Sequence, residues 1–237
     1  MFRTVIAIVR FFWCLIKKIP KMRQALAFDR KGMIAERDAV VNEQVTHWAR
    51  FVLALAGGEV EVVGEEKIPQ DTAVVFVGNH QSYFDIPILL GFISKPKAFI
   101  SKIEILKVPF LSVWMRLMQC TFLDRKNMRQ SIEAMNEAAK TVQKGYSLVI
   151  FPEGTRSKGK GFGSFKAGSF KLALKTGVPI VPVTIDGSWR LFEEKGHVAR
   201  ATVRLIIHDP VPTANLSREE SQELPALIQS RVQSALQ

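Results

Sequence analysis

Short apolar runs alternate with helix-forming segments from Glu59 onward, and this alternation restricts the fold more than any other feature of the sequence. The runs at 73–77 and 147–151 are rich in β-branched and aromatic residues and bounded by polar or turn residues, which predicts buried strands. Between them lie helical segments such as 129–144. Strands that alternate with helices predict an α/β fold with a mostly parallel or mixed sheet flanked by helices.

The first 31 residues combine an apolar run with a basic cluster. The run covers 5–16, is interrupted by Arg10, and is followed by several lysines. This segment has eight Lys and Arg residues against one Asp, so it holds most of the formal net charge of +11. A spanning helix needs roughly twenty apolar residues, more than this run provides. Apolar side chains, Trp13 and adjacent basic groups instead predict an interfacial helix held by anionic lipid.

Two other interpretations of this segment stay open. A signal peptide would have a basic start and a cleavage site such as 25–27, although four basic residues between the apolar run and that site argue against it. An ordinary core helix is the other possibility. Residues 34–56 predict a further helix that Gly57 and Gly58 end, either as the second arm of a membrane-facing hairpin or as a core helix. We therefore expect a membrane-associated helical region at 1–57 and an α/β domain at 58–237.

Net charge and cysteine content limit the partners and the compartment. A surplus of positive charge in 237 residues indicates a polyanionic partner, which could be nucleic acid, an anionic membrane surface or a phosphorylated substrate. The two cysteines, Cys14 and Cys120, form neither a disulfide framework nor a metal-binding cluster. Their number fits a reducing compartment, and no set of His and Cys residues has the spacing of metal ligands.

A histidine and an aspartate flank the turn after one predicted strand. The stretch 79–85 reads Asn-His-Gln-Ser-Tyr-Phe-Asp and precedes a helix that Pro87 helps to start. His80 and Asp85 can meet only if this turn folds back. A carboxylate bonded to one ring nitrogen would leave the other nitrogen free as a general base. The alternative is that Asp85 only caps the helix while His80 bonds a backbone carbonyl.

A basic residue follows each of three other predicted strands, at the edge where an α/β sheet presents its loops. The stretch 151–156 reads Phe-Pro-Glu-Gly-Thr-Arg, and its glycine, hydroxyl and arginine would suit phosphate or another oxyanion. Arg125 follows the strand at 121–123, and Lys102 follows the strand at 98–101. Each alone has a simpler explanation, namely a polar turn or a surface ion pair.

Taken together and in this order, these stretches resemble the glycerolipid acyltransferase family over roughly residues 60–210, specifically the bacterial 1-acyl-glycerol-3-phosphate acyltransferases. His80 and Asp85 match the His-x4-Asp motif, and Phe122 with Arg125 matches the second motif. Residues 151–156 match the third motif almost letter for letter, and 178–183 match the proline-containing fourth. The sequence departs from the family at Gln119, where the second motif commonly opens with glycine.

The resemblance implies catalytic and binding roles for these residues. His80, oriented by Asp85, would act as the general base on an acceptor hydroxyl. Phosphate would be held by Arg125 and Arg156, with Lys102 as a third candidate cation. The remaining substrate-binding residues would be Glu153, Gly154 and Thr155, which shape the acceptor site. Backbone N–H groups of the 151–156 loop are candidates to stabilise the thioester oxyanion.

The resemblance also implies the reaction and its partners. The enzyme would move a fatty acyl group from acyl-CoA or acyl carrier protein to the sn-2 hydroxyl of lysophosphatidic acid, giving phosphatidic acid. It would need no cofactor and no metal, and it would work at the cytoplasmic face of the cell membrane as a peripheral or monotopic protein. Glycerol 3-phosphate or another lysophospholipid is the alternative acceptor. A basic nucleic-acid-binding protein is a more distant alternative, against which the apolar setting of the basic cluster argues.

Overall fold

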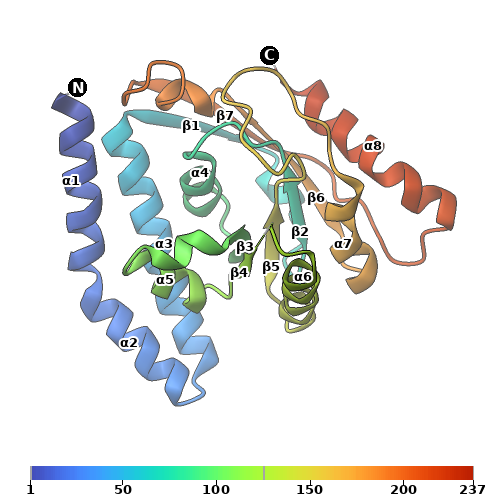
Figure 1. Cartoon of the computed structure of the whole chain (residues 1–237), viewed down its shortest axis with the longest axis horizontal. Coiled ribbons are helices and arrows are strands. Elements are labelled where there is room, and N and C mark those ends of the chain that lie inside the picture. The colour runs from blue at the N-terminus through green and yellow to red at the C-terminus, as the bar shows by residue number, and fades with distance from the viewer. Residues whose placement is uncertain (1, 125, 237) are drawn as a thin grey trace.

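A single seven-stranded sheet forms the centre of the computed structural model, which describes residues 2–124 and 126–236 (Figure 1). The strands lie in the order β1-β7-β6-β2-β5-β3-β4. Their bounds are β1 Gly58–Val63, β2 Val75–Gly78, β3 Lys97–Lys102, β4 Thr121–Leu123, β5 Ser147–Ile150, β6 Ile180–Asp186 and β7 Ala201–Ile207. The alternation of strands and helices therefore predicted the fold class correctly, and the sheet is mixed.

Five neighbouring strands of the sheet run in the same direction. β2 pairs in parallel with both β5 and β6, β5 pairs in parallel with β3, and β3 pairs in parallel with β4. Only the edge formed by β7 and β1 breaks this pattern, because β7 is antiparallel to β6. The loops that follow β2, β5, β3, β4 and β6 consequently leave the same edge of the sheet.

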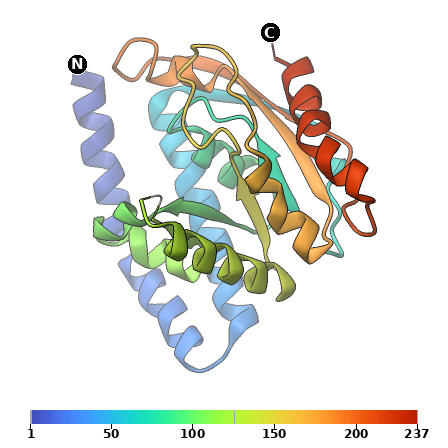
Figure 2. The same ribbon diagram turned by 45° about the vertical axis from the view of Figure 1, so that its right-hand side comes forward.

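Helices cover both faces of the sheet, with α6, α7 and α8 on one face and α3 (Ile34–Ala56) and α4 on the other (Figure 2). The bounds of the helices after α3 are α4 Asp85–Phe92, α5 Leu111–Leu117, α6 Met128–Gln143, α7 Lys171–Thr176 and α8 Arg218–Ser234. A capping box starts α8, since the Ser217 hydroxyl accepts from Glu220 N and the Glu220 carboxylate accepts from Ser217 N. The short 3₁₀ segments are η1 Glu65–Lys67, η2 Ile103–Lys107, η3 Ala167–Phe170 and η4 Ser188–Leu191.

Three helices precede the sheet: α1 Phe2–Lys17, α2 Ile19–Arg30 and α3 Ile34–Ala56. Gly57 ends α3 in the left-handed conformation that glycine favours, with φ of 78°. Large apolar side chains on α1 are exposed, including Phe12, Trp13 and Ile16. None of the helices in the described part of the chain combines the length and the hydrophobicity needed to cross a lipid bilayer.

α2 and α3 share their apolar faces with the rest of the molecule. Buried residues of both helices belong to the same core as the strands, and α3 packs closely against α4. Arg37 on α3 adds a polar link, because its guanidinium donates to Asp29 and Asp38 and to the Tyr146 hydroxyl just before β5. The proposed division at residues 57 and 58 therefore separates sequence regions whose side chains pack into one core.

Candidate active site

His80 and Asp85 meet at the edge where the parallel strands end. His80 lies two residues beyond β2 and Asp85 is the first residue of α4. The turn between them folds back, so that the His80 Nδ1 atom lies 2.7 Å from Asp85 Oδ2. The imidazole stacks on Phe151, with ring centroids 4.2 Å apart and an angle of 13° between the ring planes. The sequence-based prediction of a His–Asp pair thus agrees with the geometry.

The Asp85 carboxylate is fully buried and its charge is compensated by several donors. Its Oδ2 atom accepts from the backbone N–H groups of Gln81 at 2.7 Å and Ser82 at 2.9 Å, and its Oδ1 atom accepts from Ser188 Oγ at 2.5 Å. Because Oδ2 already accepts two N–H donors, it faces His80 as an acceptor, and Nδ1 must carry the hydrogen. In the neutral imidazole, Nε2 is then the nitrogen without a hydrogen, and no partner for it is found among the described residues.

Glu153 connects the loop after β5 to the loop after β2. Val77 of β2 lies opposite Ile150 of β5, so His80 and Glu153, three residues further along each chain, reach the same level. Glu153 Oε1 accepts from His80 N at 2.7 Å, and Oε2 accepts from Gly163 N at 3.1 Å. Burial raises the pKa of this carboxyl group, while the two hydrogen bonds oppose that shift. Glu153 therefore turns inward and fixes the backbone that carries His80.

The next residue of the 151–156 loop, Gly154, is half-buried. Gly154 has a φ of +71°, and a Cβ atom there would lie 3.1 Å from Lys166 Nζ. Thr155 is exposed. The next residues return to the loop after β2, since Ser157 N donates to His80 O at 2.8 Å and Lys158 N donates to Gln81 O at 3.1 Å. Lys166 is thus a cation beside this loop that the sequence pattern did not single out.

Arg156 lies against residues of the two neighbouring loops. Its Nη1 atom is 3.0 Å from Glu193 Oε1, and its guanidinium carbon is 3.4 Å from the centroid of the Tyr83 ring. Glu193 also accepts from Ser82 Oγ at 2.6 Å and from Tyr83 N at 3.0 Å. The predicted phosphate-binding arginine therefore has one edge and one face occupied by protein.

Lys102 and the second motif belong to strands farther from His80. Lys102 is the exposed last residue of β3, which is two strands from β2, about 10 Å across the sheet at the usual strand spacing. Arg125 lies outside the described residues, so its role stays a prediction. Gln119 stands where the family commonly has glycine, and its φ of 63° is the left-handed conformation that glycine favours.

A sequence model of the family described as Acyltransferase matches residues 59–186, which is more than half of the chain. The chain belongs to the acyltransferase family. The match confirms the family that the motifs had indicated, and it includes the strands β2 to β6 whose loops carry the site of this acyltransferase.

Curated relatives of this acyltransferase share one named activity. It is 36% identical over 195 residues to a probable 1-acyl-sn-glycerol-3-phosphate acyltransferase of Mycoplasma pneumoniae, with 77% of this chain and 73% of that protein covered. It is 38% identical over 156 residues to the chloroplastic 1-acyl-sn-glycerol-3-phosphate acyltransferase BAT2 of Brassica napus, with 65% and 45% covered. The aligned part therefore spans less than half of the plant protein's length.

A solved structure supports the fold over nearly the whole chain. The crystal structure of the 1-acyl-sn-glycerophosphate (LPA) acyltransferase PlsC from Thermotoga maritima is similar with a TM-score of 0.76 at 28% sequence identity. The likeness covers 96% of this acyltransferase and 95% of that chain. The similarity therefore extends beyond the part matched by the family model, into the N-terminal helices and the C-terminal region.

Two site residues of this acyltransferase could not be found from the motifs. Ser188 and Glu193 follow β6 and lie more than a hundred positions from the residues that they contact, Asp85 and Ser82. The sequence signal that could have indicated them is their position after β6, because β6 ends at the same edge of the sheet as β2 and β5. A loop at that edge was a reasonable place to search for partners of His80 and Arg156.

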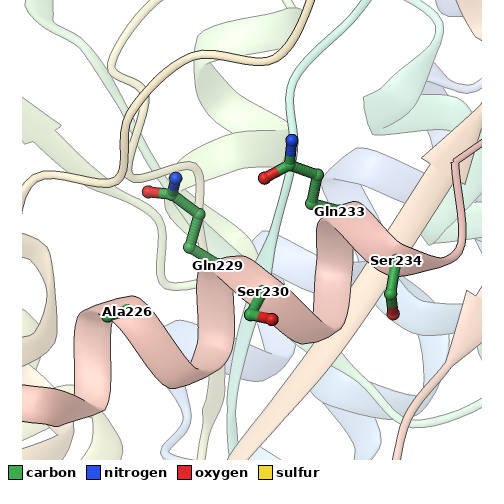
Figure 3. A pocket seen from close by; sticks show the side chains of 5 residues that line it. All are labelled: Ala226, Gln229, Ser230, Gln233 and Ser234. Carbon is green, nitrogen blue, oxygen red and sulfur yellow. The ribbon is translucent and has the colours of Figure 1, made fainter.

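Two further features of this acyltransferase lie outside the site around His80: its potential for metal binding and a hollow on α8. The described residues contain no group of three or more His, Cys, Asp and Glu side chains that could hold a metal ion. A hollow of about 380 Å³ lies along α8 (Figure 3), lined by Ala226, Gln229, Ser230, Gln233 and Ser234. Gln229, one of the lining residues, accepts from Phe165 N at 2.8 Å, which ties α8 to the loop before η3. None of these lining residues belongs to the site around His80.

Proposed function

We propose that this protein transfers a fatty acyl group from an acyl thioester to the sn-2 hydroxyl of 1-acyl-sn-glycerol 3-phosphate, giving phosphatidic acid. One observation carries the proposal, namely the contact of His80 Nδ1 with buried Asp85 beside a loop that holds Arg156. The activity after which the bacterial and plant relatives are named supports the choice of acceptor.

The proposed chemistry is general-base catalysis by His80. The unprotonated Nε2 atom removes the proton of the acceptor hydroxyl as its oxygen attacks the thioester carbonyl. The C–S bond then breaks, and the leaving thiolate takes the proton back from the imidazole. Asp85 holds the ring in the required tautomer, which supports general-base help worth about 10²–10⁴ in rate. No covalent acyl-enzyme is required, because the thioester is already activated.

The proposed acceptor site places phosphate near the cations of the neighbouring loops. Arg156 keeps donors beyond the one that contacts Glu193, and a guanidinium edge can bind phosphate in a bidentate manner. Lys102 and Arg125 remain proposed contributors, together with Gly154 and Thr155 in the same loop as Arg156. Holding the phosphate fixes the hydroxyl near His80, and well-oriented systems gain on the order of 7–11 kcal/mol from such positioning.

We also propose that the enzyme works on the cytoplasmic face of the cell membrane. The exposed apolar side chains of α1 and the basic residues that follow them support contact with an anionic lipid surface. Both substrates fit this placement, since the acceptor is a lipid and the donors, acyl-CoA or acyl carrier protein, are soluble. The proposed reaction uses no metal, so a chelator should leave the rate unchanged.

The decisive experiment measures acyl transfer by the purified protein with each acceptor and each donor. Lysophosphatidic acid and glycerol 3-phosphate are compared, each with acyl-CoA and with acyl carrier protein. We expect transfer to lysophosphatidic acid, and we expect His80→Ala to reduce its kcat at least a hundredfold without changing binding to vesicles. Exclusive use of glycerol 3-phosphate would replace the proposed acceptor, and more than a few per cent of residual activity in His80→Ala would remove this residue from its role.

A further inference from the structure

Glu193 is a buried carboxylate that the family motifs do not include. It follows η4 in the loop after β6, and its side chain is only 4% exposed. Three donors converge on it, from Arg156, Ser82 and the backbone of Tyr83. Loss of these donors would leave a buried charge unpaired and would strongly destabilise the fold. The carboxylate is therefore held in this position.

The contacts of Glu193 leave part of Arg156 available. A guanidinium has five N–H donors, and the structure commits one nitrogen, Nη1, to Glu193 Oε1 at 3.0 Å. Tyr83 covers one face of the group, with 3.4 Å between the guanidinium carbon and the ring centroid. An arginine held by one edge and one face cannot sample the many rotamers of a free side chain, so less entropy is lost when it binds an anion.

Glu193 is not placed to compete with substrate for Arg156. Its other oxygen receives Ser82 Oγ at 2.6 Å, and Oε1 is shared with Tyr83 N at 3.0 Å. Moving the carboxylate aside would leave a buried hydroxyl and a backbone N–H without an acceptor. Ser82 and Tyr83 also lie in the turn that brings His80 to Asp85, so Glu193 fixes Arg156 relative to the catalytic ring.

We propose that Glu193 and Tyr83 are positioning residues that hold Arg156 with one guanidinium edge open to the phosphate of the acceptor. This inference rests on the proposed function, because it assigns the anion bound by Arg156 to lysophosphatidic acid. Neither residue touches the reacting atoms. Their removal therefore acts mainly on the KM for the acceptor and leaves the KM for the acyl donor largely unchanged.

The test is a double-mutant cycle on the full-length protein with lysophosphatidic acid and acyl-CoA. Glu193→Ala is expected to raise the acceptor KM about tenfold, because Arg156 loses the charged hydrogen bond that fixes its guanidinium. Glu193→Gln, which keeps an acceptor oxygen, is expected to recover part of this loss. In an Arg156→Ala background, Glu193→Ala should change the acceptor KM less than twofold. Glu194→Gln, an exposed neighbour, is the matched control.

A second pair of variants does not depend on a buried substitution. Tyr83 is 64% exposed, so replacing it leaves the core intact. Tyr83→Ser should raise the acceptor KM several-fold, and Tyr83→Phe, which keeps the ring, should not. The inference fails if both Glu193→Ala and Tyr83→Ser leave the acceptor KM unchanged, or if the effects of Glu193→Ala and Arg156→Ala add independently. An acceptor KM unchanged in Arg156→Ala would instead remove the phosphate role of the arginine, while the wild-type assay tests the activity itself.

Discussion

At the scale of single residues, the Asp85 carboxylate is the acceptor on which the site depends. Its two oxygens receive His80, two backbone N–H groups and Ser188. An asparagine offers one acceptor oxygen and one NH₂ donor, so in Asp85→Asn a donor must face a donor. We expect kcat to fall by about 10²–10⁴, because the imidazole loses its orientation and tautomer. Steady-state kinetics at saturating substrates measures the change.

A control separates this effect from a general loss of carboxylate charge. Asp209 is an exposed carboxylate that lies 3.2 Å from Lys67 at the surface, and Asp209→Asn should keep wild-type kcat. Circular dichroism should show that Asp85→Asn is folded at the assay temperature. A kcat within tenfold of the wild-type value would contradict the role assigned to Asp85.

Gly154 tests whether the loop conformation after β5 matters for acceptor binding. Its φ of +71° is a conformation that residues with a Cβ rarely adopt, and a Cβ would approach Lys166 Nζ to 3.1 Å. Gly154→Ala should lower the free energy of unfolding by about 1–3 kcal/mol and raise the acceptor KM, because Arg156 is two residues away. Gly168→Ala is the matched control, since a Cβ there meets no atom within 4 Å. Equal Tm and KM values for the two variants would contradict this expectation.

At the scale of secondary-structure elements, α1 presents apolar side chains to solvent. Trp13 is 57% exposed and Phe12 is also exposed, and the basic residues that follow add attraction to anionic lipid. The double variant Phe12→Ser/Trp13→Ser should bind anionic vesicles more weakly, about tenfold or more, because burying an aromatic side chain is worth about 1.5–3 kcal/mol. Vesicle sedimentation measures the partition. Ile132→Ser is the control, since Ile132 on α6 is also 57% exposed, and equal binding of both variants would refute the membrane role of α1.

The elements themselves were largely predictable, whereas their contacts were not. Apolar runs such as 147–151 identified strands, and Gly57 identified the end of α3, because these signals are local. The His80–Asp85 pair was predictable because only five positions separate the two residues. The order of strands and the arrival of Ser188 and Glu193 depend on packing between distant segments, for which a single sequence contains no periodic signal.

At the scale of the whole molecule, one buried lysine should make stability depend on pH. Lys97 starts β3, is buried, and donates from Nζ to Ile93 O at 2.8 Å. Burial lowers the pKa of this amine to about 7, opposed by the charge of Glu65. In the unfolded chain a lysine holds its proton up to about pH 10.4. Between these values the unfolded state binds more protons, so the free energy of unfolding rises with pH across this window.

Lys97→Met isolates this contribution, since methionine fills a similar volume without a charge. We expect the variant to be more stable than the wild type at pH 7 by on the order of a few kcal/mol, because each unit of pKa shift corresponds to about 1.4 kcal/mol. The advantage should shrink as the pH rises toward 10, where the amine is neutral in both states and the wild type keeps its hydrogen bond to Ile93. Urea unfolding at pH 7, 8.5 and 10 measures the difference, with the exposed Lys171→Met as control. A stability difference that does not change with pH would show that Lys97 is charged in the folded protein, and the core around the start of β3 would then have to admit water.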